Sequence, residues 1–202
     1  MKIAILMEGE TERVFLSYLR AFLSDKLKGK MPKLASNIYD GRIPKQGKLK
    51  RIVETLLRGA NPDADHVIAL TDVYTGSNDF RDGAEAKRKM RVWVGPNERF
   101  HPHVAQHDFE AWLLPYWPTI QALAIHNKSA PSGRPETVNH NRPPSFHLKE
   151  IFRTGKSTRH YTKVRDAKRI LYGQDLSVAA AACPELRAFL NRILTLSGGE
   201  AI

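Results

Sequence analysis

The sequence predicts an α/β protein with a three-layer architecture: a parallel sheet covered by helices, followed by a mostly helical, basic C-terminal appendage. Three observations carry this prediction. Short apolar runs recur along the chain, amphipathic segments at helical spacing separate them, and prolines become frequent beyond residue 115. Strands that alternate with helices form parallel βαβ units, whose crossover helices cover the sheet.

The elements follow one another regularly in the first part of the chain. The expected strands, each a short apolar run, are residues 2–7, 34–39 and 66–71 and a run near Val104. The expected helices begin at Thr11 and cover residues 49–57 and 84–94. Residues 1–115 are therefore expected to form a core domain. Residues 116–202 are expected to pack on it as the appendage, with its last helix starting at Pro184.

Composition places the chain among ordinary globular proteins. Of its 202 residues, 42% are hydrophobic and 26% charged, which is enough to bury a core. The single cysteine, Cys183, excludes a disulfide framework within the chain and fits a reducing compartment. The apolar run at the N-terminus stops at Glu8, too early for a signal peptide or a membrane span. We expect a cytoplasmic protein that does not enter a membrane.

Basic charge is concentrated in one segment, because residues 142–169 carry +7 of the net charge of +11. A local excess of this size suits a polyanion, whose binding releases condensed counterions, although a solvated basic face is the simpler alternative. The residues expected to contact nucleic acid are Arg153, Lys156, Arg159, Lys163, Arg165, Lys168 and Arg169. Aromatic residues among them could stack on unpaired bases or pack within helices: Phe146, Phe152 and Tyr161.

Acidic residues follow the expected strands where each strand ends. They are Glu8 and Asp72, which close strands, Asp108 and Glu110, which follow the run near residue 104, and Glu12, one helical turn after Glu8. Any one of them alone could be a helix cap or a solvated loop group. Together, at the carboxyl edge of a parallel sheet, they would repel one another unless a cation neutralised them. Oxygen donors favour Mg²⁺ or Mn²⁺, so we expect a site for one of these ions.

Several short motifs resemble those of TOPRIM domains in the OLD-type (overcoming lysogenization defect) nucleases. The opening Glu8-Gly-Glu-Thr-Glu12, after an apolar strand, resembles the E-G-x-T-E of those domains. Further motifs are Thr71-Asp72-Val-Tyr74, residues 106–114, residues 134–139, Pro144-Ser145, Tyr161-Thr-Lys163 and Cys183-Pro184. In this order, over nearly the whole chain, they are similar to a family of short stand-alone TOPRIM-like proteins of unassigned function. That family is commonly encoded beside AAA- or ABC-type ATPases and is suspected of roles in phage defence.

The resemblance implies a metal-dependent nuclease that hydrolyses phosphodiester bonds in DNA or RNA. Glu8 and Glu12 match the paired acids of the opening motif, and Asp72 matches the first acid of the TOPRIM D-x-D. Lys163 matches a late lysine that would stabilise charge on the phosphate. The implied catalytic residues are therefore Glu8, Asp72 and Lys163. An ATPase partner and a role in bacterial defence, or a toxin-like one, are implied with them, while a homodimer stays open.

One position departs from the family pattern, because Tyr74 stands where D-x-D has its second acid. Asp79, or Asp108 with Glu110, could replace the missing ligand. Alternatively, the chain has kept the fold as a catalytically inactive binding or regulatory module. A metal phosphohydrolase acting on nucleotides is a third reading, which would need a closed pocket rather than an open basic groove.

Overall fold

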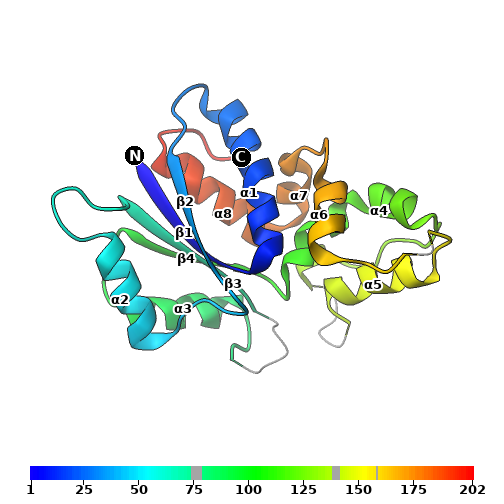
Figure 1. Ribbon diagram of the computed structural model, residues 1–202, viewed down its shortest axis with the longest axis horizontal. Coiled ribbons are helices and arrows are strands. Elements are labelled where there is room, and N and C mark those ends of the chain that lie inside the picture. The colour runs from blue at the N-terminus through cyan, green and yellow to red at the C-terminus, as the bar shows by residue number, and fades with distance from the viewer. Residues whose placement is uncertain (74–78, 138–141, 158) are drawn as a thin grey trace.

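The computed structural model describes residues 1–73, 79–137, 142–157 and 159–202 of the chain. Its strands are β1 (Lys2–Glu8), β2 (Lys33–Tyr39), β3 (His66–Asp72) and β4 (Phe100–Ala105). They form one sheet in the order β2-β1-β3-β4, and every neighbouring pair is parallel (Figure 1). All carboxyl ends of the strands therefore lie at one edge of the sheet.

Helices connect the strands and make up most of the second half of the chain. The α-helices are α1 (Gly9–Leu27), α2 (Gln46–Leu56), α3 (Gly83–Val94), α4 (Trp117–Ala124), α5 (Pro144–Thr154), α6 (Lys163–Leu171), α7 (Leu176–Ala182) and α8 (Pro184–Leu196). Three short 3-10 helices are η1 (Phe109–Trp112), η2 (Leu114–Tyr116) and η3 (Pro135–Thr137). The expected strands and helices of the first 115 residues all occur, with ends shifted by up to three residues.

Side chains that alternate along the strands divide the core into two halves. Ile3 and Ile5 of β1 face a cluster that contains residues of α1 and α8, whereas Ala4 and Leu6 face residues of α2 and α3. This alternation is the two-residue period of a strand that is buried on both faces. The result is a helix–sheet–helix sandwich, which confirms the predicted fold class (Figure 1).

The C-terminal helices take part in the same packing. Helix α8 packs against β4 and α1, and its Phe189 stacks on Trp112 of η1 with ring centroids 6.1 Å apart. Lys87 of α3 also pairs with Glu185 of α8 at 2.7 Å. Beyond the carboxyl edge of the sheet, α4, α5 and α6 form a smaller helical group (Figure 1). A division into domains near residue 115 stays a prediction.

In the described parts of the chain, every helix is too short or too polar to span a bilayer.

Candidate metal centre

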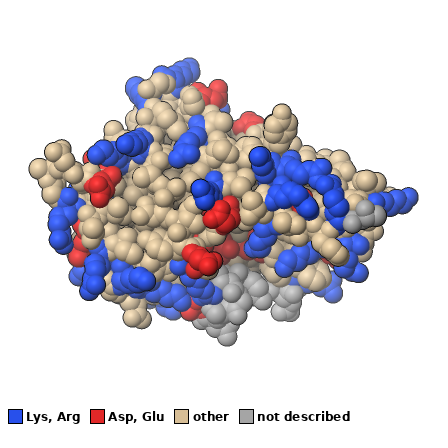
Figure 2. All heavy atoms as spheres, in the orientation of Figure 1, with Lys and Arg blue, Asp and Glu red and all other residues tan. Residues whose placement is uncertain are grey.

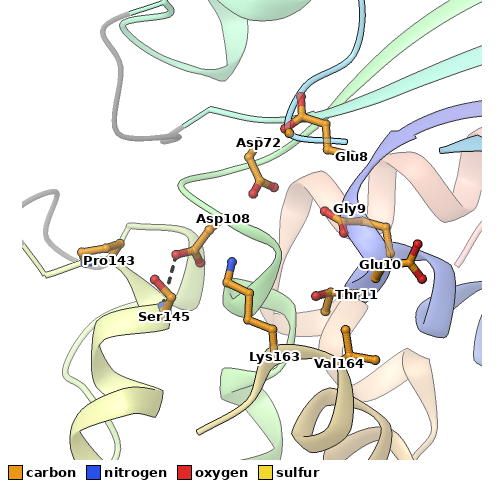
Figure 3. Close-up of a pocket in the computed structure, with 12 residues that line it drawn as sticks. Glu8, Gly9, Glu10, Thr11, Asp72, Asp108, Pro143, Ser145, Lys163 and Val164 are labelled. Carbon is orange, nitrogen blue, oxygen red and sulfur yellow. Dashed lines mark hydrogen bonds between the residues drawn. The ribbon is translucent and has the colours of Figure 1, made fainter. Parts of the chain in front are cut away.

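A pocket with a volume of about 490 Å³ opens at the carboxyl edge of the sheet. Its described lining residues come from six parts of the chain that lie far apart in sequence. These include Glu8 and Glu12, Asp72, Asp108 with Ser145, and Lys163. Figure 3 shows the side chains of Asp72, Asp108 and Lys163 turned toward a common space at the end of β3 and the start of α5 and α6. The parallel sheet accounts for this convergence, because each strand delivers its last residue to the same edge.

The turn from β1 into α1 brings the two acids of the opening motif together. Gly9 has φ +70°, a left-handed conformation that most side chains disfavour. A Cβ atom at Gly9 would lie 3.1 Å from Oε2 of Glu12, so the carboxylate of Glu12 folds back over this glycine. Glu8 and Glu12 are both buried, with 5% and 7% of their surfaces exposed. The glycine between them is therefore required by backbone conformation and by close approach.

Glu8 is fixed in place by its neighbours across the sheet. Its Oε1 accepts a hydrogen bond from the Thr71 hydroxyl and one from the Ile43 backbone N–H at 3.3 Å. Burial raises the pKa of Glu8, and these two hydrogen bonds oppose that rise. Asp72, the residue after Thr71, ends β3 beside it. Its side chain faces the pocket, as Figure 3 shows.

A sharp turn after β4 delivers the remaining two acids. His107 has φ +67°, a conformation that His adopts more readily than most residues, and the 3-10 helix η1 follows at once. Asp108 is 4% exposed, and its Oδ2 accepts a hydrogen bond from the Ser145 backbone N–H at 3.1 Å. Glu110 is fully buried and accepts a hydrogen bond from the Tyr161 hydroxyl at 3.3 Å. Ser145 of α5 thus holds Asp108, and Tyr161, which precedes α6, holds Glu110.

Lys163 is the cation of the pocket. It is the first residue of α6, and its Nζ lies 3.2 Å from Oε1 of Glu110. Burial would lower the pKa of Lys163, but Glu110, Asp72 and Asp108 outweigh that effect and raise the pKa above its ordinary value. The ammonium is therefore charged at neutral pH and reaches toward Asp108 and Asp72 (Figure 3).

The acids resist ionisation because they are buried beside one another. Burial, with repulsion from Glu110 and Glu8, raises the pKa of Glu12 to about 8. Burial and the charge of Glu110 raise the pKa of Asp108 to about 7. The pKa of Asp72 is also raised, by burial and then by Glu12, Glu8 and further acids. One lysine does not neutralise this set, so a bound cation would relieve both the burial cost and the repulsion.

The donor set fits a hard divalent cation. It consists of carboxylate oxygens, which Mg²⁺ and Mn²⁺ prefer, and Oδ1 of Asp108 is buried without a hydrogen-bond partner among the described residues. Over the same residues, no three His, Cys, Asp or Glu side chains already stand together as a formed metal site. Binding would therefore need side-chain rotations within the pocket, for which its open volume leaves room.

The sequence suggested Asp79, or Asp108 with Glu110, as replacements for the second acid of the D-x-D motif. Tyr74, which replaces the second acid of the D-x-D motif, lies outside the described residues. Asp79 does not line the pocket and instead forms salt bridges with Arg42 and with Lys45, the latter at 2.7 Å. Asp108 lines the pocket directly. Glu110 forms a salt bridge with Lys163, which also lines the pocket. Of the suggested replacements, the structure thus favours Asp108 with Glu110.

Sequence reasoning assigned no role to Thr71, Ser145 or the Ile43 N–H, which hold Glu8 and Asp108 in position. Pro144 is the first residue of α5, a position that proline favours. The direction of that helix toward Asp108 depends on contacts across 37 residues of sequence. Such contacts leave no local pattern.

The residues expected to contact nucleic acid lie on and around α5 and α6. The exposed ones are Arg153, Lys156, Arg159, Lys163, Arg165 and Lys168, while Arg169 is half-buried. Arg165 donates to both oxygens of the buried Asp166, at 3.0 and 2.8 Å, and Arg169 lies 4.0 Å from it. These two guanidinium groups are therefore partly neutralised within the protein.

The aromatic residues of this segment divide between core and surface. Phe152 is 1% exposed and belongs to the core, so of the two alternatives for these residues, packing applies to Phe152. Tyr161 packs against it and bonds to Glu110. Phe146 is 37% exposed. Packing of α5 against α4 and η1 explains this outcome, because the apolar face of α5 turns inward.

Comparisons with known proteins agree with the fold. A family model described as "Domain of unknown function (DUF4276)" matches residues 7–194. The C-terminal region of the Burkholderia pseudomallei OLD protein is similar at 14% identity and a TM-score of 0.55, over 97% of this chain and 98% of that chain. The C-terminal region of the Xanthomonas campestris pv. campestris OLD protein is similar at 16% identity and a TM-score of 0.47, over 97% and 95%. No curated protein matches this chain significantly. At this identity, the Burkholderia match shows a shared fold.

Proposed function

We propose that this chain, which belongs to the DUF4276 family, is a Mg²⁺- or Mn²⁺-dependent nuclease that hydrolyses phosphodiester bonds of DNA or RNA. The observation that carries the proposal is the set of buried, mutually repelling carboxylates that faces a pocket beside Lys163. The similarity of the whole chain to OLD C-terminal regions supports the same class of site.

The residues that would hold the ion are Glu8, Glu12, Asp72, Asp108 and Glu110. A bound divalent ion would make a water molecule nucleophilic at neutral pH and offset charge on the leaving oxygen. Glu8 is held in one orientation by Thr71 and Ile43, and Asp108 is held by Ser145. With Glu8 and Asp108 already held in this way, fewer donors would have to be rearranged when the ion binds.

Lys163 would contact the reacting phosphate. Its side chain is half-exposed and lines the pocket, so a phosphate oxygen could replace part of the contact between its Nζ and Glu110. A positive charge aimed at the phosphate stabilises the transition state more than the bound substrate, because negative charge develops as the bond breaks. The exposed cations of α5 and α6 would hold the flanking phosphates.

The resemblance to TOPRIM-like proteins encoded beside ATPases supports two further elements of the proposal. The chain would act with an ATPase partner, and it would serve as an effector in a bacterial defence or toxin-like system. Both can be examined by co-expressing the chain with the product of a neighbouring ATPase gene and testing for a stable complex by size-exclusion chromatography.

The experiment that tests the nuclease proposal uses purified protein with end-labelled DNA and tRNA, with and without Mn²⁺. Wild type should cleave only with the metal ion, and Glu8→Gln should lose this activity. Glu98→Gln is the matched control, because Glu98 is exposed and precedes β4, at the opposite edge of the sheet. Cleavage that survives in Glu8→Gln would contradict the proposal.

An inactive binding or regulatory module is the second candidate, favoured by Tyr74 in place of an acid. In that case wild type would bind nucleic acid and leave it intact with Mn²⁺ present. Wild type and Glu8→Gln would bind nucleic acid with equal affinity.

A further inference from the structure

The carboxylates of the pocket form a row whose order follows the strand order. Glu8 ends β1, Asp72 ends β3, and Asp108 with Glu110 follow β4. Lys163 pairs with Glu110 and so marks the β4 end of this row. The opposite end lies beside β2, the edge strand next to β1. Any charge in the segment after β2 therefore flanks the row on the side away from Lys163.

A group of cations occupies that side. Arg42 and Lys45, which follow β2, both form salt bridges with Asp79. Lys89 of α3 donates to the Asp79 backbone carbonyl at 3.0 Å, and its Nζ also lies 3.4 Å from Glu85. We call Arg42, Lys45 and Lys89 the β2-side cluster. It lies outside the basic segment 142–169 to which the sequence directed attention.

The backbone after β2 places this cluster next to the pocket. Gly41, directly before Arg42, lines the pocket, and the backbone N–H of Ile43, directly after Arg42, donates to Oε1 of Glu8 at 3.3 Å. Arg42 and Lys45 share the Asp79 carboxylate, and Lys89 contacts the Asp79 carbonyl and Glu85. Cations gathered this closely repel one another, and a phosphate group would relieve that repulsion as well as pair with them.

The surface of the molecule carries basic side chains on both sides of a central acidic area (Figure 2). In Figure 2, acidic side chains gather near the centre of the visible face. A dense group of Lys and Arg side chains lies on one side of them, over α6, and further basic side chains lie on the other side, toward α2 and α3. Acids at the centre with cations on both sides suit an extended polyanion whose central phosphate reaches the acids with a bound cation.

We propose that the β2-side cluster is a second phosphate-binding surface, which with the Lys163 side holds a polynucleotide strand on both sides of an internal phosphodiester bond. This inference rests on the proposed nuclease function for the identity of the central bond, and it predicts an endonuclease. Cations on both sides of the acids would bind phosphates of a strand that continues past the central bond in both directions.

Binding tests the surface without requiring cleavage. The test variant is Lys45→Ala/Lys89→Ala, and the control is Lys2→Ala/Lys33→Ala, which removes the same charge from the amino edge of the sheet. Affinity for a labelled single strand is measured over a salt series with Ca²⁺ as the divalent ion. The slope of log affinity against log salt should fall by about 1.4 in the test variant, since each lost contact to a single strand removes about 0.7. An equal slope in the test and control variants would contradict the proposal that the β2-side cluster binds phosphates.

Cleavage of closed circles tests whether the bond is internal. Circles of single-stranded DNA, single-stranded RNA and duplex DNA are each compared with a linear counterpart in Mn²⁺. At least one circle should be opened, with a full-length linear first product. Cleavage of linear substrates alone would overturn the inference. Wild type could cleave no substrate while the slope of log affinity against log salt still falls in the test variant. In that case the nuclease proposal fails and the phosphate-binding surface stands.

Discussion

The molecule buries acidic side chains in two regions, and the two regions treat them differently. Glu136, in the C-terminal half, accepts hydrogen bonds from the Trp112 indole and from the backbone N–H groups of Glu185 and Leu186 at 3.0–3.3 Å. Asp166 accepts from the Thr162 N–H at 2.7 Å and from Arg165. In the pocket, by contrast, Asp72, Glu12 and Asp108 face one another.

The difference teaches that burial alone does not mark a functional site. Burial also raises the pKa of Glu136, but three donors oppose that rise, and the carboxylate ties η3 to η1 and to the start of α8. The pocket acids have fewer donors than their number requires, and neighbouring acids raise their pKa further. A buried acid with internal partners stabilises the fold, whereas a buried acid facing other acids is prepared for an external cation.

The largest effect should come from Asp72→Asn, which removes a charge from the centre of the row. Cleavage should fall by about 100-fold or more, as when one electrostatic group of a reaction centre is lost. The metal-free variant should melt at a higher temperature than wild type, because repulsion is reduced. Asp63→Asn, on an exposed loop before β3, is the control and should change neither quantity. A lower melting temperature in Asp72→Asn would mean that Asp72 stabilises the fold, as the buried Glu136 does.

Glu136→Ala should act on stability. The substitution leaves an indole N–H and two backbone N–H groups buried without their acceptor. A loss of about 2–3 kcal/mol in the free energy of unfolding follows, measured by urea denaturation. The exposed control Glu98→Ala should stay within about 0.5 kcal/mol of wild type. If Glu136→Ala proved as stable as that control, Glu136 would not be an anchor.

The pH dependence of stability should distinguish the pocket further. The pKa of Glu12 is raised from 4.5 to about 8 and that of Asp108 from 3.8 to about 7, so the folded state holds these protons more tightly than the unfolded state. Their contribution to stability is present at low pH and is lost as pH rises toward about 8. Thermal melts without metal should show this decline.

Mn²⁺ competes with the same protons, so the increase in melting temperature that it produces should grow between pH 5 and pH 8. A metal effect that does not change with pH would contradict the coupling between cation binding and the pocket acids.

The smallest expected effect is that of Gly9→Ala. The left-handed backbone at Gly9 and the nearby Glu12 carboxylate both disfavour a side chain. The cost in stability should be about 1 kcal/mol, and Mn²⁺ affinity should weaken as Glu12 is displaced. The same substitution at Gly47, which has neither a positive φ nor a close neighbour, should be tolerated. Equal behaviour of the two variants would mean that the Glu12 carboxylate is not held by this turn.

Much of the fold could be predicted from the sequence because its signals are local. The apolar run that ends at Glu8 and the helical spacing after Thr11 depend on neighbouring residues only, and both elements occur. The meeting of Glu8, Asp72 and Asp108 followed from one further inference, that the strands are parallel.

Other features could not be predicted because they depend on distant partners. Asp79 was considered as a ligand, yet Arg42 and Lys45 occupy its carboxylate from across 37 and 34 residues of sequence. Phe152 lies among basic residues in the sequence but packs inward, since the helix is amphipathic and its apolar face meets the core. The donors that satisfy Glu136 include residues 49 and 50 positions away.

The central claim is that the uncompensated acids of the pocket await a divalent cation. Anomalous diffraction from crystals grown with Mn²⁺ tests it most directly, with Asp72→Asn crystals as the comparison. The account predicts a Mn²⁺ peak within about 2.0–2.5 Å of carboxylate oxygens drawn from Glu8, Glu12, Asp72, Asp108 and Glu110, and its loss or weakening in the variant. Well-ordered crystals without a peak in this pocket at millimolar Mn²⁺ would contradict it.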